Sequence, residues 1–258
     1  MKAVRHQAIL QLIRETGSQS TENLASHLQV SKETIRRDLQ ELQTQGQLIR
    51  RHGWAKIVKR ETQDSGDSFR ARQKSHQSRK ADIARQALSW IDEGMVIALD
   101  ASSTCWSLAR QLPDISITVF TNSARVCREL SKRQNIQLIS SGGRLLRKYD
   151  CYVNPALFSQ LKTLEIDLFL FSCEAVDAAG AIWDSNDSNA EYKIALLRRA
   201  AQSLLLLDKS KLNRTSEVQI GHLDDVTQVI SDLSDAQQRN EKPYSASTCA
   251  VTFAGRLA

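Results

Sequence analysis

The stretch Val30-Ser-Lys-Glu-Thr-Ile-Arg-Arg-Asp-Leu-Gln-Glu-Leu42 has the residue pattern of one short helix with a marked beginning. Ser31 is a favourable N-cap residue, because its hydroxyl can accept a hydrogen bond from a first-turn amide. Ile35, Leu39 and Leu42 then recur at helical spacing, so one face of the helix is apolar and can pack on a core. This helix is therefore expected to pack on the core of the N-terminal region.

The opposite face of the predicted helix carries hydrogen-bond donors and positive charge. Its polar side chains are those of Lys32, Thr34, Arg36 and Arg37. A helix that is anchored by leucines and presents such groups outward fits the major groove of DNA. Taken alone, the pattern is equally compatible with an ordinary amphipathic helix at a protein surface. The flanking residues decide between these two interpretations.

Two further helices are predicted before this one. Residues 3–15 carry apolar side chains at helical spacing, and a second helix begins at Ser20 or Thr21 and buries Leu24 and Leu28. Two short helices joined by a tight turn, the second of them basic, form a helix-turn-helix.

A short hairpin is predicted after the basic helix. Residues 47–58 read as two β segments around a polar turn, which is the pattern of a wing. Arg50, Arg51 and His52 lie at its tip, where they can reach DNA phosphates or a minor groove. A solvated hairpin without DNA contacts is the alternative.

The charge of the 258-residue chain is concentrated at its N-terminus. Residues 1–60 hold 11 Lys and Arg against 5 Asp and Glu, whereas the remaining 198 residues hold 24 of each, so the whole excess of +6 lies in the first part. This distribution is typical of a small nucleic-acid-binding domain joined to a neutral domain.

The run Thr34-Ile-Arg-Arg-Asp-Leu39, with the preceding helix, a following glycine and the hairpin, resembles the DeoR family of bacterial transcription regulators. The resemblance implies that the basic helix is the recognition helix for double-stranded operator DNA. Asp38 would repel phosphate, so we expect it to pair with a neighbouring arginine. The DNA-binding residues that the resemblance implies are Ser31, Lys32, Glu33, Thr34, Arg36, Arg37, Arg50, Arg51 and His52.

Composition bounds the class of protein. No apolar run approaches the ~20 residues of a membrane span, and the first residues lack the pattern of a signal peptide. The five cysteines are scattered, without CxxC or zinc-ligand spacing. We therefore expect a cytoplasmic protein with free thiols and no metal.

The chain divides into four predicted parts. Residues 1–59 are the predicted winged helix-turn-helix, and residues 60–76 are a polar linker in which Phe69 is the one large apolar side chain. Residues 77–232 alternate helical patterns with short apolar runs, which predicts an α/β domain with a mostly parallel sheet. The tail, 233–258, is predicted to be poorly ordered, with an alternative short strand near Thr248–Phe253.

Polar clusters follow the predicted strands, where α/β sheets bind ligands. Asp100-Ala-Ser-Ser-Thr104 joins a strand to a helix and can form an anion site with the free helix amides. Plain N-capping by Ser102 or Ser103 is the alternative. Similar clusters follow other strands at Thr121-Asn-Ser123, Ser141-Gly-Gly143 and Asp208-Lys-Ser-Lys211.

These clusters resemble the C-terminal sensor domain of the DeoR family. That domain is similar to sugar-phosphate isomerases and CoA-transferases, and it binds a phosphorylated sugar as inducer. The predicted effector residues are Asp100, Ser102, Ser103, Thr104, Thr121, Asn122, Ser123, Gly142, Gly143, Glu174, Asp208, Lys209 and Lys211. Glu191 and Lys193 also fit the family's pattern.

The chain departs from the family at Ser102, where glycine is usual, and at Ser172-Cys-Glu-Ala175, where a glycine-rich loop is usual. These side chains narrow the approach of a ligand to the backbone, which indicates a particular sugar. Four segments, 100–106, 151–155, 168–174 and 183–186, resemble the branch of the family that regulates L-fucose use. That branch implies activation by L-fuculose 1-phosphate, although composition and spacing distinguish no sugar.

Three other functions are compatible with parts of the sequence, the simplest of which is a DNA-binding protein without a small ligand. A repressor of another carbohydrate operon, responding to a different sugar phosphate, is the main alternative, since repression is the commoner outcome in the family. An isomerase-like enzyme could use Asp100, Glu174 or Asp208 as a base, but no nucleophile–base pair is evident. We therefore predict no catalytic residues and no cofactor. A homo-oligomer is expected, because helix-turn-helix proteins usually read paired half-sites.

Overall fold

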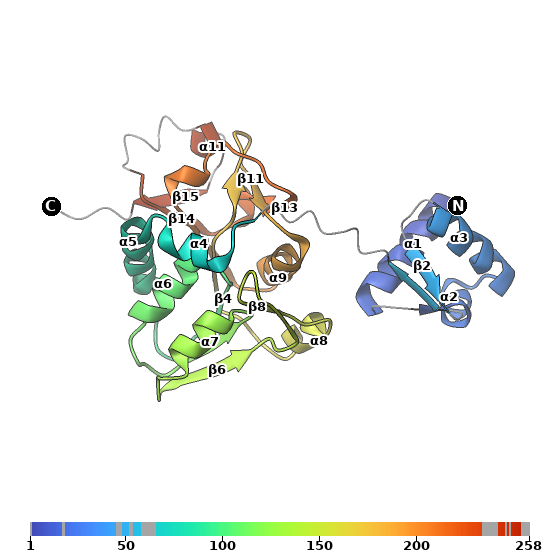
Figure 1. Ribbon diagram of the computed structural model, residues 1–258, viewed down its shortest axis with the longest axis horizontal. Helices are drawn as coiled ribbons and strands as arrows, with labels where there is room; N and C mark the ends of the chain where they lie inside the picture. The colour runs from blue at the N-terminus through green and yellow to red at the C-terminus, as the bar shows by residue number, and fades with distance from the viewer. Residues whose placement is uncertain are drawn as a thin grey trace. The chain divides into compact units, whose positions relative to one another are not determined.

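The computed structural model forms two compact units, Met1–Thr62 and Gln63–Ala258, each of which is described by itself (Figure 1). The described residues are 2–16, 19–44, 48–51, 54–57, 66–233, 242–245, 247 and 249–253. The division at Thr62 lies close to the predicted domain end at residue 59. Within the described residues, no helix has both the length and the apolar character that crossing a bilayer requires.

The first unit is a winged helix-turn-helix, as predicted. Its helices and strands are α1 (Lys2–Thr16), β1 (Gln19–Ser20), α2 (Thr21–Leu28), α3 (Lys32–Thr44), β2 (Leu48–Arg51) and β3 (Trp54–Ile57). The strands form an antiparallel sheet in the order β1-β3-β2. His52, which the sequence places at the wing tip, and Gly46, the glycine that follows the basic helix, lie outside the described residues.

Local chemistry explains where the helices of this unit begin. The Ser20 hydroxyl accepts the amide of Asn23 at 3.0 Å, and the Ser31 hydroxyl accepts that of Thr34 at 3.1 Å. Each bond pairs a first-turn amide that has no partner within its helix. The apolar faces of the helices meet in one core, whose fully buried members include Ile9, Ile13, Leu24, Ile35, Leu39, Leu42 and Leu48.

The second unit is built on a seven-stranded parallel sheet in the order β15-β14-β12-β9-β4-β5-β6. Six of these strands lie within residues 77–232, where the sequence shows short apolar runs between helical patterns. The strands are β4 (Val96–Leu99), β5 (Ile117–Thr121), β6 (Ile136–Ser140), β9 (Leu168–Phe171), β12 (Gln202–Leu207), β14 (Gln228–Ser231) and β15 (Ala250–Phe253).

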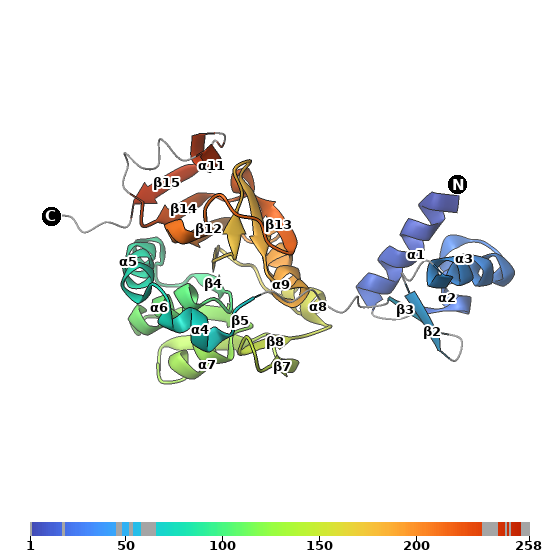
Figure 2. The ribbon, with the colours of Figure 1, turned by 45° about the horizontal axis from the view of Figure 1, so that its top comes forward.

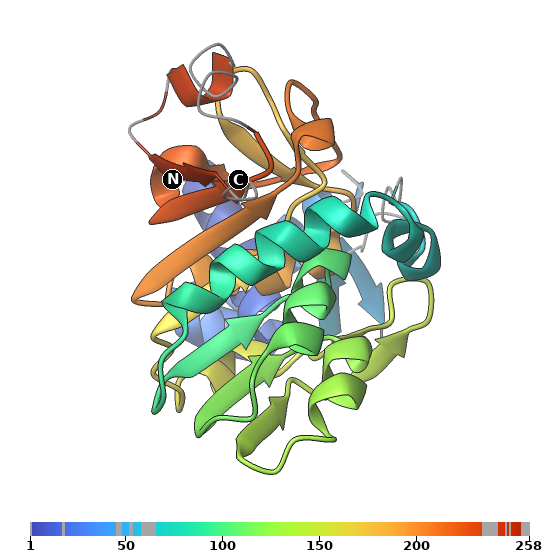
Figure 3. The same cartoon turned by 90° about the vertical axis from the view of Figure 1, so that its left-hand side faces the viewer.

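Helices cover both faces of this sheet. On one face lie α5, α6 and α7 (Figure 3). The other face carries α8, α9 and a small second sheet. The helices are α4 (Phe69–Lys74), α5 (Gln77–Ala87), α6 (Ser103–Gln111), α7 (Ala124–Leu130), α8 (Leu157–Leu161), α9 (Asp187–Leu197) and α11 (Lys242–Ser245), and the 3-10 turns are η1 (Leu88–Trp90), η2 (Lys209–Lys211) and η3 (Leu223–Asp225).

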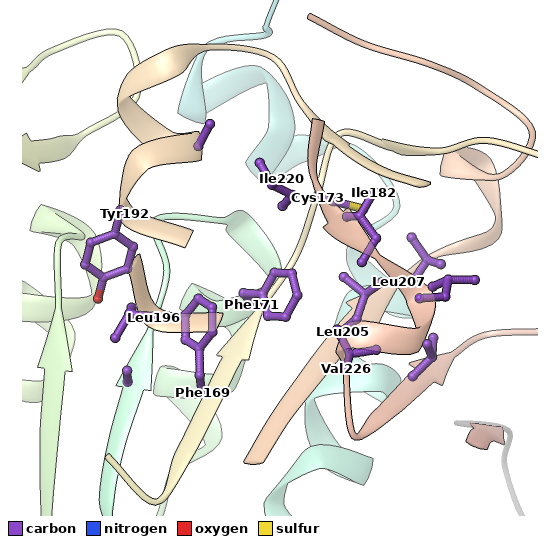
Figure 4. Packing of buried hydrophobic residues seen from close by; sticks show 14 of the residues in the cluster. Phe169, Phe171, Cys173, Ile182, Tyr192, Leu196, Leu205, Leu207, Ile220 and Val226 are labelled. Carbon is purple, nitrogen blue, oxygen red and sulfur yellow. The ribbon is translucent and has the colours of Figure 1, made fainter. Parts of the chain in front are cut away.

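Strand β9 shows why the central strands read as continuous apolar runs. Successive side chains of a strand point to opposite faces. Leu168 and Leu170 belong to the core under α5–α7, whereas Phe169 and Phe171 belong to the core on the other face. The two phenylalanine rings stack at 4.8 Å, and Phe169 meets Tyr192 of α9 edge-on at 6.3 Å (Figure 4). Both faces of β9 are therefore buried.

Several short elements have no counterpart in the sequence prediction. Strands β7 (Arg144–Leu146) and β8 (Cys151–Val153) form a hairpin. Strands β10 (Ala175–Val176), β11 (Ala181–Asp184) and β13 (Val218–His222) form the small antiparallel sheet. Strands of two to five residues are too short to establish an alternating pattern in the sequence.

The predicted linker needs correction. Residues 60–65 lie outside the described residues, but Phe69–Lys74 forms helix α4, capped by the Ser68 hydroxyl at the Ala71 amide, 3.3 Å away. Phe69 is fully buried, and its ring meets Trp106 of α6 edge-on at 6.1 Å. A single apolar residue gives no periodicity, so the sequence did not reveal this helix.

The prediction of a poorly ordered tail is wrong for two described segments. Residues 242–245 form α11, in which Tyr244 is buried. Residues 250–253 form β15, which pairs in parallel with β14, in the region where a short strand was the alternative. Thr248, where that strand was expected to begin, lies outside the described residues.

Candidate DNA interface and effector site

The outward face of α3 presents the predicted DNA-binding side chains. Ser31, Lys32 and Glu33 are exposed, and the Arg36 and Arg37 side chains are 60% and 78% exposed. Both arginines approach Glu33, at 3.5 and 3.8 Å. Exposed pairs of this kind contribute about 0–1 kcal/mol. The arginines can therefore exchange Glu33 for another anionic partner at little cost.

Two predicted residues of this helix differ from that description. The Lys32 ammonium is paired with Glu22 of α2, which partly neutralises it. Thr34 is half-buried, and its hydroxyl lies 2.8 Å from that of Ser31. Both residues therefore also stabilise the turn between α2 and α3.

Asp38 has the structural role that the sequence predicted. It is buried at 2% exposure and contacts Arg5 and His6 of α1. Burial by itself would raise the pKa of this carboxyl group, but the hydrogen bonds from Arg5 and His6 outweigh burial and hold the pKa below its ordinary value. The acidic residue of the helix thus faces the protein interior.

The wing exists as a hairpin in which Arg51 pairs with Trp54. The side chains of Arg50 and Arg51, and the whole of His52, lie outside the described residues. Their contact with phosphates or a minor groove stays a prediction.

A polar pocket lies in the second unit at the carboxyl ends of β4 and β9, which are neighbours in the sheet. Parallel sheets commonly bind ligands at this edge. The lining residues come from the two strand ends and from α4, β11 and α9. They are Arg72, Asp100, Ala101, Ser102, Ser172, Cys173, Glu174, Asp184, Ser185, Asn189 and Lys193.

Three buried charges meet in this pocket. The ammonium of Lys193 on α9 lies 3.0 Å from the Oδ2 atom of Asp100 and is also paired with Asp184 at the end of β11. Burial opposes the charges of Lys193 and Asp100. Nevertheless the two carboxylates raise the pKa of Lys193, and Lys193 together with the Ser102 contact lowers the pKa of Asp100. Lys193 and Asp100 are therefore held as an ion pair, and Asp184 is paired with the same ammonium group.

Asp100 also joins two loops of the pocket. Its Oδ1 atom accepts the Ser102 amide at 3.0 Å, and its Oδ2 atom accepts the Ser172 amide at 3.3 Å. The Ser102 hydroxyl accepts the Cys105 amide at 3.0 Å, so N-capping of α6 by Ser102 is real. N-capping does not exclude an anion site, because an α-helix N-terminus has further first-turn amides without helical partners, here those of Ser103 and Thr104.

The cluster after β5 does not line the pocket. Thr121 donates its hydroxyl to the Leu99 carbonyl at 2.8 Å and accepts the Ser123 amide at 3.0 Å. Ser123 caps α7 through the Val126 amide. Asn122 is buried beside them. The hydroxyl groups of Thr121 and Ser123 are therefore used within the sheet edge itself, whereas the Oδ1 atom of Asn122 has no hydrogen-bond partner among the described residues.

The two glycines after β6 also have a structural explanation. Gly142 and Gly143 have φ values of +61° and +93°. Residues with a Cβ atom rarely adopt this backbone conformation. A Cβ atom at Gly143 would lie 2.3 Å from the Val153 carbonyl oxygen. The close approach is made by β8, and neither glycine lines the pocket.

The cluster after β12 is divided. Asp208 is buried and accepts the Ser210 amide at 3.2 Å, and Lys209 is exposed away from the pocket lining. The Lys211 ammonium donates to the Ser172 hydroxyl at 2.9 Å and to the Cys173 carbonyl at 2.7 Å. Lys211 therefore stabilises the loop after β9 and is not part of the pocket lining. This arrangement differs from the prediction that two ammonium groups face the ligand.

The family pattern is likewise divided on α9, where Lys193 lines the pocket and Glu191 is exposed. Sequence reasoning missed Arg72 and Asn189. Asp184 and Ser185 stood in a segment, 183–186, that had been noticed only as a mark of one branch. Arg72 stood in the supposed linker, where no pattern pointed to it.

All five cysteines are free in the structure. Among the described residues, no cluster of three His, Cys, Asp or Glu side chains is arranged to hold a metal ion.

Comparison with known proteins gives the family. Residues 5–61 match the DeoR-like helix-turn-helix domain, and residues 75–233 match the DeoR C terminal sensor domain. The chain belongs to the DeoR family. This DeoR-family protein is a DNA-binding transcription regulator with a C-terminal sensor domain, and the predicted architecture is confirmed.

Relatives of this DeoR-family regulator carry names of transcription regulators. It is 68% identical to the "L-fucose operon activator" of Escherichia coli K12 over 232 residues, which are 90% of this chain and 96% of the relative. It is 39% identical to the protein of the same name from Haemophilus influenzae, over 89% of this chain and 92% of that one. The "Glycerol-3-phosphate regulon repressor" of E. coli K12 is 27% identical over 88% of this chain and 90% of the relative.

Among solved structures, a ribose 5-phosphate isomerase A from Methanocaldococcus jannaschii resembles this DeoR-family regulator. The TM-score is 0.41 at 17% identity, over 54% of this chain and 55% of the other. A likeness this distant carries no information about substrate or reaction.

Proposed function

We propose that this regulator activates an operon for L-fucose utilisation and responds to L-fuculose 1-phosphate bound in the pocket at the carboxyl ends of β4 and β9. The observation that carries the proposal is the 68% identity to an L-fucose operon activator across 96% of that protein's length.

The chemistry of the pocket supports a hydroxylated, anionic ligand. The carboxylates of Asp100, Glu174 and Asp184 are acceptors for sugar hydroxyl groups. The Oδ1 atom of Asn189 is buried without a hydrogen-bond partner among the described residues and provides a further acceptor. The N-terminus of α6, beginning at Ser103, suits a phosphate group.

The first unit supports binding to duplex DNA. Helix α3 enters the major groove, with Arg36 and Arg37 as donors to bases or phosphates. Paired half-sites require a homo-oligomer. The effector acts by binding the DNA-competent and DNA-incompetent states with different affinity, since a ligand without such a difference shifts no equilibrium.

The first experiment is a thermal-shift series on the full-length protein with L-fucose, L-fuculose, L-fuculose 1-phosphate and D-ribose 5-phosphate. A ligand that binds only the native state raises Tm with concentration. We expect a rise with L-fuculose 1-phosphate alone. A rise only with another sugar phosphate would assign the protein to another operon, and no rise with any of them would refute the sensor function.

A repressor of another carbohydrate operon is the second candidate, because a glycerol-3-phosphate regulon repressor aligns over 88% of this chain. In vitro transcription from the fucose-operon promoter distinguishes the two. The proposal requires transcript to increase when protein and L-fuculose 1-phosphate are both present. Reduced transcript would favour the repressor.

An isomerase-like enzyme is not proposed. Of the bases that the sequence offered, Asp208 lies outside the pocket lining and Asp100 is ion-paired with Lys193. Glu174 lines the pocket, but the other two carboxylates of the lining, Asp100 and Asp184, are both ion-paired with Lys193. Incubation of L-fuculose 1-phosphate or D-ribose 5-phosphate with the protein should leave the sugar unchanged by NMR.

A further inference from the structure

Helix α4 brings an arginine to the pocket from outside the sheet. The helix packs on α6 (Figure 2). The Phe69 ring lies edge-on against that of Trp106. The Phe69 amide also donates to the Lys148 carbonyl at 2.9 Å. One turn further along, Arg72 lines the pocket together with the residues of the sheet edge.

The Arg72 side chain is held in place from three sides. Its Nε atom donates to the Asp67 carbonyl at 3.2 Å. Its guanidinium carbon lies 5.7 Å from the ring centroids of both Phe69 and Tyr149. Its Nη2 atom is nevertheless buried without a hydrogen-bond partner within the described residues. A guanidinium group is always charged, and a buried donor without a partner is costly.

Arg72 is also the cation of this pocket that has no counter-ion. Of the two cationic residues in the lining, Lys193 is paired with Asp100 and Asp184. In the part of the chain that the structure describes, no carboxylate forms an ion pair with Arg72. Its planar fork suits two parallel hydrogen bonds to a phosphate group.

We propose that Arg72 binds the phosphate of the effector and thereby couples effector binding to the segment that leads into the sensor unit from the DNA-binding unit. The inference rests on the proposed function, namely that the pocket takes a sugar phosphate. It adds a phosphate-binding residue, Arg72, that lies outside the sheet. Arg72 also lies outside residues 75–233, which match the family's sensor domain.

The backbone before α4 supports the coupling. The Gly66 carbonyl accepts the Tyr149 hydroxyl at 3.3 Å. A Cβ atom at Gly66 would lie 2.2 Å from the hydroxyl oxygen of Ser185, which lines the pocket. The DNA-binding unit ends at Thr62, shortly before Gly66 in the sequence. The segment Gly66–Arg72 therefore lies against the pocket wall and ends at Arg72, the residue proposed to bind the phosphate group.

The far end of α4 is fixed to α5. Buried Lys80 donates its ammonium to the carbonyls of Arg72 and Ser75 at 2.7 and 2.9 Å, and to the Ser75 hydroxyl at 3.1 Å. The backbone of Arg72 is therefore anchored on the sensor unit. Its unpaired Nη2 atom is left for a ligand to bind.

Isothermal titration calorimetry of the full-length protein tests the inference. The variants are Arg72→Ala, Arg72→Lys and Arg70→Ala, the last being an exposed arginine on the same helix. Each is titrated with L-fuculose 1-phosphate and with L-fuculose. We expect Arg72→Ala to weaken binding of the phosphorylated sugar by about ten- to a hundredfold. Binding of the unphosphorylated sugar should change little, and Arg70→Ala should match the wild type.

The outcomes separate the two levels of the proposal. Wild-type protein that binds no sugar phosphate refutes the proposed function. Suppose that the wild-type protein binds the sugar phosphate. If the Arg72→Ala variant then binds equally well, or loses affinity for both sugars equally, the role of Arg72 is refuted and the proposed function stands. If Arg72→Ala does not fold, Arg72→Lys gives the same test, because an ammonium cannot form the two parallel bonds and should weaken binding of the phosphorylated sugar selectively.

Hydrogen exchange tests the coupling itself. Saturating wild-type protein with L-fuculose 1-phosphate should slow exchange of the amides in Gly66–Lys74, and the same effector occupancy in Arg72→Ala should not. Unchanged exchange of this segment in the saturated wild-type protein would overturn the coupling, whatever the affinities.

Discussion

The carboxylate of Asp38 on α3 receives two bonds from the guanidinium of Arg5 on α1, at 2.5 Å to Nε and 3.1 Å to Nη2. His6 approaches the same carboxylate at 3.1 Å. The buried side of the recognition helix is thus tied to α1 by charge as well as by leucines. This pair fixes the orientation of the arginines on its opposite face.

Replacing Asp38 with Asn should destabilise the DNA-binding unit. The change removes a charge-assisted pair that is 2% exposed, so we expect a loss of about 1.5–3 kcal/mol in the free energy of unfolding. Hydrogen exchange of the α3 amides in the full-length protein measures it. Glu41→Gln, which breaks an exposed pair with Lys2, is the control and should change little. Equal effects of the two changes would contradict this account.

The same pair predicts a response to acid. The pKa of Asp38 is lower in the folded state than its ordinary value of 3.8. Its contribution to stability is therefore complete above that value and disappears as the pH falls through the folded-state pKa. In an acid titration followed by exchange of the α3 amides, Asp38→Asn should lose this part of the pH dependence. Superimposable acid profiles would exclude it.

Arg37→Ala should weaken operator binding without affecting the fold. The side chain is 78% exposed and its near neighbour is Glu33 at 3.8 Å. If Arg37 contacts a phosphate, its replacement should reduce the salt dependence of binding by about one unit of slope. If Arg37 contacts a base, its replacement should cost about 1–3 kcal/mol of binding free energy and relax specificity. Fluorescence anisotropy at several salt concentrations distinguishes these outcomes. Arg85→Ala, an exposed change in the sensor unit, is the control; affinity equal to it would remove Arg37 from the interface.

Lys193→Met should destabilise the sensor unit strongly. It leaves the buried carboxylates of Asp100 and Asp184 facing each other without a cation, a change that typically costs about 3–5 kcal/mol. Urea unfolding of the full-length protein measures the loss, and the exposed change Lys162→Met serves for comparison. A second change, Asp184→Asn, should restore part of the stability. No recovery in the double variant would mean that charge is not the cause.

The two lysines after β12 form a matched pair. Lys211→Ala removes the ammonium that holds Ser172 and the Cys173 carbonyl, so the β9 loop of the pocket should loosen and effector affinity should fall. Lys209→Ala removes an exposed side chain outside the pocket and should leave affinity unchanged. Calorimetry with L-fuculose 1-phosphate compares them. If Lys209→Ala loses more effector affinity than Lys211→Ala, Lys209 contacts the ligand, as the sequence had predicted.

Lys80 predicts a change of stability in alkali. Burial lowers its pKa to about 8, and the positive charge of Lys211 acts in the same direction, whereas the ordinary value is 10.5. Between these values the unfolded chain binds more protons than the folded one, so stability rises with pH in this window. Lys80→Met should lack the rise, and the exposed control Lys74→Met should keep it. Denaturant titrations from pH 7.5 to 10.5 that run parallel for all three proteins would contradict the assignment.

Sequence reasoning succeeded where a pattern is local and repeated. The caps Ser20, Ser31 and Ser102 and the apolar face of α3 were all visible because the residues that form each feature are close in sequence. Parallel strands end at one edge of their sheet, so Asp100 and Glu174 could also be placed together at a site.

The remaining site residues come from tertiary packing. Arg72 reaches the pocket because Phe69 docks α4 on α6, and Asn189 reaches it because α9 crosses the opposite face of the sheet. Neither approach leaves a period or a motif. Conversely, Thr121 and Gly143 looked like ligand contacts but are required by the Leu99 carbonyl and by strand β8. A polar or flexible residue type at a strand end identifies the edge of a sheet, and only the packing tells which residues face a ligand.

Strand β15 has a consequence for the solubility of shortened versions of this protein. Its backbone groups pair with those of β14, whose Val229 and Ile230 are fully buried. A chain cut after Leu233, where the sensor-domain match ends, would leave β14 with an unpaired row of amides and carbonyls beside apolar side chains. Such a strand is a template for addition of another chain, and self-association through it would be mistaken for native oligomerisation. Residues 250–253 therefore cover an edge of the sheet to which another chain could otherwise add.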